Sequence, residues 1–394
     1  MGAPSPGRSA RIDALRGFAV FGILLINVWG FVYGYTALRY GVVEASATGA
    51  DRLAIFFAAA FAEQKFYPIF SFLFGAGFAL QMRSLEEKSG LDTAKKIYLR
   101  RLKWLLVIGL VHGTLLWFGD ILTAYALTGF WLLTRAGQTL AGTLRSLRIA
   151  IIVNAFVLLL TAILIAAIAT MADYGAETAA EALLANDVYS SGGWSEVARA
   201  RLSDFGANIG GFWLFVPRIA LLFLFGVATV QLGWLTHPEL HRAVWRRILL
   251  TGLFVALPFN VWWGYEALGW ALDPEMNTRS MHGASFLLDL TGPALGAAYV
   301  AVFMLAGERV MGVVSGWLTP VGRMALTNYL MQSALCGALL PAYGLGLGAV
   351  LTRAQLMLVW VSIVVIQVLF SRWWLARHEQ GPMEALWRRY TYRE

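Results

Sequence analysis

The sequence predicts an all-α, polytopic integral membrane protein with about ten transmembrane helices. Of its 394 residues, 59% are hydrophobic and only 14% are charged, whereas soluble domains carry about 25% charged residues. The mean hydropathy is +0.64. The 16 Trp and 14 Tyr residues suit two aromatic belts at the membrane interfaces. We find no convincing sequence repeat and no low-complexity tract beyond the apolar spans, so we treat residues 1–394 as a single transmembrane domain.

A helix that crosses the hydrocarbon core needs roughly 20 apolar residues. The ten candidate spans are 12–33, 53–81, 99–117, 119–133, 149–171, 212–234, 245–266, 282–306, 318–340 and 355–375. The second is too long for one span, so residues 51–63 could form an interfacial helix that leads into it. The fourth is short. The first apolar stretch has no cleavage site after a short core, so we expect it to remain as a span.

The distribution of basic residues predicts that both termini lie on the cytoplasmic side. With the N-terminus inside, most of the 31 Lys and Arg residues fall in inner segments, as the positive-inside rule requires. The outer segments hold only Arg39, Arg52, Arg199, Arg201, Arg279 and Arg353. An even number of spans places both termini on one side, which agrees with the count of ten.

The longest predicted outer loop covers residues 172–211 and is acidic. Helical patterns at 176–184 and 196–202 flank a Ser-Ser-Gly-Gly hinge at 190–193. This loop could cap a site that opens outward, although a plain connection explains it equally well.

Three polar side chains, Asp13, Arg16 and Asn27, share one face of the first span. Arg16 and Asn27 are eleven residues apart, close to three helical turns, and Asp13 precedes Arg16 by three residues. Polar groups in a membrane helix are costly and usually face a protein interior or a wet cavity. The stripe therefore predicts a polar route that begins at the inner surface.

Most other polar residues within the spans fall in the outer half of the membrane. A tight turn should bring Asp120 to the depth of His112, where a carboxylate can orient a histidine as a general base or form a static bond. Lys65 could pair with Glu63 or Glu266, or extend outward. We expect the following residues to line an outward-facing substrate cavity: Lys65, Arg218, Glu266, His282 and Asp289. His282 and Asp289 lie two turns apart on one face, although His282 could simply be interfacial.

The net charge of +8 is explained by membrane topology, so we expect no nucleic-acid partner. The basic loop at 82–103 suits contact with lipid headgroups, or capture of a phosphorylated cytoplasmic co-substrate. No set of His, Cys and carboxylate residues has metal-site spacing, so we expect no metal. The single cysteine, Cys336, excludes an intramolecular disulfide. The sequence leaves open whether the chain forms a homo-oligomer.

Five ordered motifs resemble the YeiB family of bacterial inner-membrane proteins. They are Asp13-Ala-Leu-Arg-Gly-Phe-Ala-x-x-Gly-Ile-Leu-x-x-Asn27, Lys65-Phe-x-x-x-Phe-Ser-Phe-Leu-Phe-Gly-Ala-Gly77, His112-Gly with Phe-Gly-Asp-Ile-Leu122, Gly322-Arg-Met-Ala-Leu-Thr-Asn-Tyr-Leu330 and Gly381-Pro-Met-Glu-Ala-Leu-Trp-Arg-Arg-x-Thr391. The resemblance covers nearly the whole chain and implies a multi-pass protein of the bacterial inner (plasma) membrane.

The first span is also distantly similar to that of transmembrane acyltransferases of the heparan-α-glucosaminide N-acetyltransferase type. Such enzymes pass an acyl group from cytoplasmic acyl-CoA to an acceptor across the membrane. In the related enzymes that acylate polysaccharides, a catalytic His follows an Arg by eleven residues. Here Arg16 is followed at that spacing by Asn27, so a base has to come from elsewhere, and His112 is the candidate.

We therefore expect transmembrane acyl transfer, with acyl-CoA as co-substrate. Its phosphates would lie near Arg16, Arg100, Arg101 and Lys103. His112, oriented by Asp120, would be the base, and Asn27 would stabilise the oxyanion. The acceptor would be a glycan, glycolipid or small molecule on the outer side.

The alternative is a proton-coupled small-molecule transporter or exporter. Asp289, Glu266 and His112 would then serve as relay groups. A structural role in an envelope complex has no feature of its own in this sequence.

Overall fold

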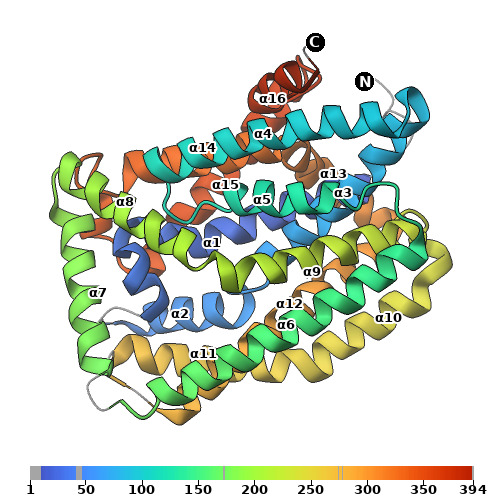
Figure 1. Cartoon of the computed structure of the whole chain (residues 1–394). Helices are drawn as coiled ribbons and strands as arrows, with labels where there is room; N and C mark the ends of the chain where they lie inside the picture. Colours follow the sequence, from blue (N-terminus) through green and yellow to red (C-terminus); the bar gives the residue numbers. More distant parts are fainter. Residues whose placement is uncertain (1–9, 41–46, 172–173, 274, 277, 393–394) are drawn as a thin grey trace.

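The computed structural model describes residues 10–40, 47–171, 174–273, 275, 276 and 278–392. Every regular element in these ranges is a helix, which confirms the all-α prediction (Figure 1). The α-helices are α1 (Ala10–Tyr40), α2 (Gly49–Phe61), α3 (Phe66–Ser89), α4 (Leu91–Leu115), α5 (Leu122–Leu133), α6 (Leu140–Ile168), α7 (Tyr174–Ser191), α8 (Trp194–Gly210), α9 (Phe212–Gln231), α10 (Arg242–Thr251), α11 (Leu257–Leu272), α12 (Arg279–Leu305), α13 (Glu308–Arg323), α14 (Ala325–Leu339), α15 (Arg353–Leu375) and α16 (Pro382–Tyr392).

Seven helical segments in these ranges are long and apolar enough to cross a membrane. They are α1, α2 with α3, α6, α9, α10 with α11, α12 and α15. The chain is therefore a multi-pass membrane protein. The remaining predicted spans fall on α4, whose first half is strongly basic, on the 12-residue α5 and on the 15-residue α14. The count of ten crossings stays a prediction.

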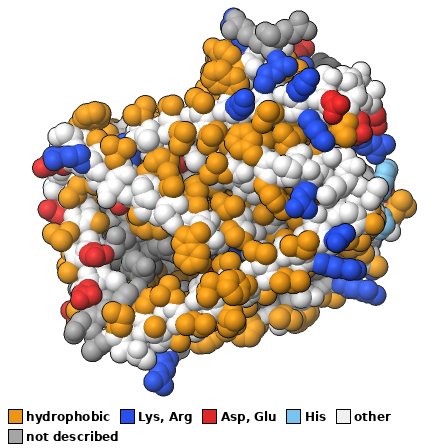
Figure 2. Space-filling view, viewed as in Figure 1, with side chains coloured by type: hydrophobic (Ala, Val, Ile, Leu, Met, Phe, Trp, Pro, Cys, Tyr) orange, Lys and Arg blue, Asp and Glu red, His pale blue; other side chains and the backbone are white. Residues whose placement is uncertain are grey.

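The outer surface has the apolar character that lipid requires. Ile152 and Phe156 on α6 are 68% and 59% exposed, and large apolar side chains are rarely exposed in such numbers on soluble proteins. Figure 2 shows apolar side chains across the middle of one face, with most Lys and Arg toward the right-hand edge. This distribution follows the charge asymmetry of the sequence, and the N-in, C-in orientation remains a prediction.

The helices α1 and α13 cross so closely that their backbones touch. A Cβ added at Gly322 would overlap the carbonyl oxygen of Asp13, and one at Gly17 would overlap that of Leu318. Small residues allow membrane helices to approach in this way without a hydrophobic driving force between them. The crossing holds the first span, with its polar stripe, against the second half of the chain.

The predicted span 53–81 is not one helix. It is broken between α2 and α3, where Gln64 has a positive φ of 64°. The separate α2 agrees with the expected short helix at 51–63. At the break Lys65 is fully buried, and its ammonium group donates to the carbonyl of Ala59 (3.0 Å). This burial corrects the expectation that Lys65 extends outward, while its alternative partner Glu63 is close enough to interact electrostatically with the ammonium group.

The predicted span 318–340 is also broken, at Met324 (φ −112°, ψ 34°), between α13 and α14. The expectation of one continuous helix was wrong because the first turn of α14 bonds to another segment. The Glu384 carboxylate accepts the backbone N–H groups of Leu326 (2.7 Å) and Thr327 (3.1 Å). A carboxylate at a helix N-terminus satisfies donors that have no partner within the helix.

The predicted outer loop 172–211 forms the helices α7 and α8, which are longer than expected and meet near the predicted hinge. The Asp204 carboxylate on α8 accepts the Tyr189 hydroxyl of α7 (2.8 Å) and the backbone N–H of Tyr35 in α1 (3.2 Å). Burial raises the pKa of Asp204 in spite of these two donors. The hairpin therefore packs on the first span as well as on itself.

Candidate functional site

The turn between α4 and α5 is organised by the carboxylate of Asp120. One of its oxygens accepts both the backbone N–H and the hydroxyl of Thr123, each at 2.7 Å. The other lies 2.8 Å from Nδ1 of His112. A Cβ at Gly109 would meet Thr123, so the glycine permits the close approach of α4 and α5. The contact expected between His112 and Asp120 is therefore present, and the carboxylate is held from three directions.

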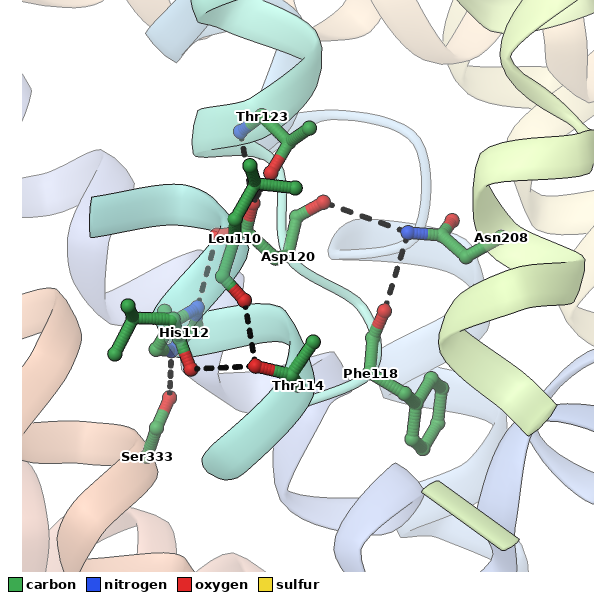
Figure 3. A network of polar contacts seen from close by, with 9 residues as sticks. Leu110, His112, Thr114, Phe118, Asp120, Thr123, Asn208 and Ser333 are labelled. Carbon is green, nitrogen blue, oxygen red and sulfur yellow. Dashed lines mark hydrogen bonds and ion pairs between the residues drawn. The ribbon is translucent and has the colours of Figure 1, made fainter. Parts of the chain in front are cut away.

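The second ring nitrogen of His112 reaches a residue far away in the sequence. Nε2 lies 2.8 Å from the hydroxyl of Ser333 on α14 (Figure 3). A carboxylate can only accept, so we assign the Nδ1 proton to the Asp120 bond and the Nε2 lone pair to the Ser333 hydroxyl. His112 and Ser333 are 1% and 3% exposed. The result is a buried chain of carboxylate, imidazole and hydroxyl.

The helix α8 contacts the same turn from its other side. The Asn208 amide donates to the carbonyls of Phe118 (3.1 Å) and Asp120 (3.4 Å) (Figure 3). The Arg201 guanidinium donates to the carbonyl of Leu115 (2.8 Å) and to the hydroxyl of Tyr343 (2.6 Å). The hairpin of α7 and α8 thus holds the end of α4 and the turn that carries Asp120.

A groove of about 520 Å³ lies between α4, α14 and α16, and His112 forms part of its wall. The other lining residues are Trp104, Val107, Ile108, Val111, Leu116, Thr327, Leu330, Met331, Ala334, Met383, Leu386, Trp387 and Tyr390. Ligand sites typically have volumes of about 300–1,000 Å³, with mostly apolar walls and few polar groups. His112 and Thr327 are the only side chains of this wall, apart from the ring-borne groups of Trp and Tyr, that offer polar atoms.

The helix α16 forms one wall of the groove and is held by three sets of contacts. At its start, Glu384 bonds to the first turn of α14, where it also accepts the Thr327 hydroxyl (2.5 Å). Further along, the Trp387 indole donates to the carbonyl of Arg101 (2.9 Å), and the Arg101 guanidinium lies 3.5 Å from the Trp387 ring centre. The Trp104 and Tyr390 rings stack at 4.3 Å. The sequence motifs at 322–330 and 381–391 are therefore in direct contact, through Thr327 and Glu384.

The polar stripe of the first span is only partly engaged. Asp13 and Arg16 form the ion pair expected from their spacing (2.7 Å). Asn27 is half-buried, and its amide makes no hydrogen bond with the described residues. Arg16 is close enough to Arg101 for the two guanidinium groups to repel each other. The structure thus joins the inner end of the stripe to the basic end of α4, whereas Asn27 makes no direct bond to His112.

The residues expected to line one outer cavity lie in separate arrangements. Arg218 of α9 and Asp289 of α12 form an ion pair (2.8 Å) whose side chains are 15% and 23% exposed. Glu266 accepts the indole of Trp262 (3.0 Å) and the hydroxyl of Ser280.

The shared face of His282 and Asp289 does not bring the two side chains into contact. Seven helical residues separate them by about 10 Å along the axis. The Asp289 carboxylate meets Arg218 instead, while His282 is buried near the start of α12.

Several residues that build the site were not identified from the sequence. Ser333 and Thr123 belong to residue types that are common in membrane helices, and no spacing pattern links Ser333 to His112. Glu384 lies in a recognised motif, but its contact with α14 joins segments 57 residues apart. Only the resemblance of whole motifs to a family could have drawn attention to these residues.

Comparison with known proteins gives relatives whose roles are uncharacterised. Residues 229–394 match a family described as "Protein of unknown function (DUF418)". The uncharacterised protein YxaH of Bacillus subtilis (strain 168) is 31% identical, with 97% of this chain and 93% of the relative aligned. The uncharacterised protein YeiB of Escherichia coli (strain K12) is 30% identical over 98% and 97% of the two chains. No solved structure matches. Because the similarity to YeiB extends over nearly the full length of both proteins, the chain belongs to the YeiB family.

Proposed function

We propose that this protein is a transmembrane acyltransferase of the bacterial inner membrane. It would take an acyl group from cytoplasmic acyl-CoA and transfer it to a glycan, glycolipid or small-molecule acceptor on the outer side. The observation that carries the proposal is the environment of His112. The imidazole is oriented by Asp120, presents Nε2 to a hydroxyl and forms part of the wall of an apolar groove.

This arrangement has the parts that general base catalysis needs. An imidazole whose Nδ1–H is held by a carboxylate keeps its Nε2 lone pair in a fixed direction. Nε2 lies 2.8 Å from the Ser333 hydroxyl, so this nitrogen is placed to accept a proton from a hydroxyl group. Such a base contributes about 10²–10⁴-fold to a rate.

The inner end of α4 supplies positive charge for the phosphates of acyl-CoA. Arg100 precedes His112 by twelve residues, which is about 18 Å along a helix. A donor whose phosphates and thioester are separated by an extended arm can span this distance, as CoA does. Nearby, Arg16 and Arg101 repel each other, and the carboxylate of Asp13 forms an ion pair with Arg16. A phosphate between the two guanidinium groups would relieve that repulsion.

Asn27 is the proposed oxyanion donor. Its amide makes no hydrogen bond with the described residues, so it can donate to substrate without breaking a bond that holds the fold. Removing one such donor typically slows a reaction about 10²–10³-fold.

The test uses the full chain in nanodiscs, with radiolabelled acetyl-CoA and palmitoyl-CoA as probes. Wild type should bind one of them saturably and transfer the label to material from membrane extracts. His112→Ala should retain binding and lose transfer by about 10²–10⁴-fold. His237→Ala is the matched control, because His237 is an exposed loop histidine. Absence of binding by wild type, or undiminished transfer by His112→Ala, would overturn the proposal.

One observation favours the alternative of a proton-coupled transporter. The break between α2 and α3 buries Lys65 beside the glycine-lined face of α12, where a Cβ at Gly292 or Gly296 would meet the backbone of the break. Discontinuous helices of this kind form substrate and ion sites in transporters. Flux into proteoliposomes that follows a pH gradient and disappears in Asp289→Asn would favour this reading over the enzyme.

A further inference from the structure

The hydroxyl of Ser333 differs from those hydroxyl groups that bond to the backbone of their own helix. Ser71, Thr128 and Ser362 each donate to the carbonyl four residues earlier in their own helix, at 2.8, 2.7 and 2.9 Å. This is the usual way in which serine and threonine satisfy their hydroxyl groups within a helix. Ser333 has one hydrogen-bond partner among the described residues, and it is Nε2 of His112 on another helix. Its proton is therefore directed at a base.

We propose that Ser333 is the nucleophile of the transfer reaction and carries the acyl group as a covalent ester. The proposal rests on the acyl transfer proposed above and adds a step to it. Asp120, His112 and Ser333 reproduce the connectivity of a catalytic triad, with a distance of 2.8 Å at each side of the imidazole. Such triads are recognised by geometry and roles and occur on unrelated folds.

The surroundings of the triad also suit this role. The two bonds from Thr123 hold the Asp120 carboxylate, so the carboxylate can stabilise the imidazolium that forms when His112 takes a proton. Because the site is buried, this stabilisation acts in a low dielectric environment.

The groove brings an acyl group to the triad. His112 lines the groove and lies within hydrogen-bonding distance of Ser333, so the hydroxyl is next to a residue of the groove wall. Leu330 and Ala334, which flank Ser333 on α14, are also in the wall. Since the wall is apolar, it fits a hydrocarbon chain, and we infer that the transferred group is a fatty acyl chain.

The reaction balances without any further reactant. The Ser333 oxygen attacks the thioester carbonyl, and its proton passes to Nε2 of His112. The carbon–sulfur bond breaks, and the CoA thiolate takes that proton and leaves as the thiol. The acceptor hydroxyl then gives its proton to His112 as its oxygen attacks the serine ester, and Ser333 leaves with the proton returned.

Two measurements on the full chain in nanodiscs test the nucleophile. The first uses a fluorophosphonate probe, which reports an activated serine whatever the natural donor is. Wild type should be labelled at Ser333, and both Ser333→Ala and His112→Ala should lose labelling by at least about 100-fold. Ser362→Ala is the matched control, because its hydroxyl bonds only to its own helix, and it should be labelled as wild type.

The second measurement uses palmitoyl-CoA without acceptor. Wild type should release CoA in a burst of one equivalent and gain the palmitoyl mass on the peptide that contains Ser333. Ser333→Cys should give a thioester that hydroxylamine cleaves rapidly, which shows that the site remains folded. Transfer that depends on His112 but persists in Ser333→Ala without an adduct would overturn the nucleophile while leaving acyl transfer intact. Fluorophosphonate labelling of Ser333 without any acyl-CoA turnover would instead support the nucleophile and overturn the proposed donor.

Discussion

The attachment of α16 can be tested by removing the carboxylate of Glu384. This side chain accepts the N–H groups of Leu326 and Thr327 and the Thr327 hydroxyl. Glu384→Ala leaves the first turn of α14 without these partners and frees the start of α16. Glu384→Gln keeps the shape and one accepting oxygen, so it should have an intermediate effect.

The size of the effect follows from the three bonds. Hydrogen bonds to a charged group contribute about 1.5–3 kcal/mol each when they are buried, but Glu384 is half-buried. Helix-capping carboxylates and hydroxyls are usually worth about 0.5–2 kcal/mol in total. We therefore expect Glu384→Ala to weaken the attachment of α16 by about 2 kcal/mol, which is close to 30-fold in an equilibrium constant.

Limited trypsin digestion measures this opening directly. Cleavage after Arg388 or Arg389 requires the last helix to unfold locally, and its rate follows the open population when closing is fast. Glu384→Ala should be cut about 30-fold faster than wild type. Glu379→Ala is the matched control, since Glu379 is a nearby exposed carboxylate whose side chain makes no bond with the described residues. If both variants were cut at the rate of wild type, the carboxylate would not be what holds α16.

Three further predictions concern other parts of the fold. Gly322→Ala should destabilise the protein by about 1–3 kcal/mol in thermal unfolding, because the added methyl enters the backbone contact between α1 and α13. Gly316→Ala is the control and should be tolerated, because a Cβ at Gly316 meets no atom within 4 Å. Arg218→Met should destabilise by leaving Asp289 partly buried without its partner, and Asp289→Leu in the same chain should recover most of the loss; equal stability of single and double variants would contradict this. Burial raises the pKa of Asp204, so the folded hairpin of α7 and α8 favours the protonated carboxyl group. The protection of α7 and α8 in hydrogen exchange should therefore fall as pH rises through that pKa. The variant Asp204→Asn should lose this dependence on pH.

The predicted features that the structure contains are those that depend on neighbouring residues in the chain. The contact between His112 and Asp120 joins the two sides of one tight turn, so eight residues of sequence were enough to predict it. The pair of Asp13 and Arg16 follows in the same way from a spacing of three residues in a helix. The separate helix at the start of the second apolar stretch could be expected from length alone.

The predictions that failed required knowledge of which helices are neighbours. Periodicity placed His282 and Asp289 on one face of a helix, but it could not show that the Asp289 carboxylate bonds to Arg218, 71 residues away. The helix at 318–340 was expected to be continuous. It breaks at Met324, and the first turn of α14, which follows the break, is capped by Glu384 of α16. In both cases the strongest available partner comes from a distant segment.

Hydropathy and residue spacing by themselves determined that this chain is a helical membrane protein and that His112 has a carboxylate partner. These properties depend on the length of apolar runs and on contacts within a turn, and both can be read along one dimension. Only the tertiary structure decided that Ser333 completes the chain of carboxylate, imidazole and hydroxyl, and that α16 forms a wall of the groove beside it. The His112–Ser333 contact spans 221 residues, and it exists because the packing of α4 against α14 buries two polar groups that must satisfy each other.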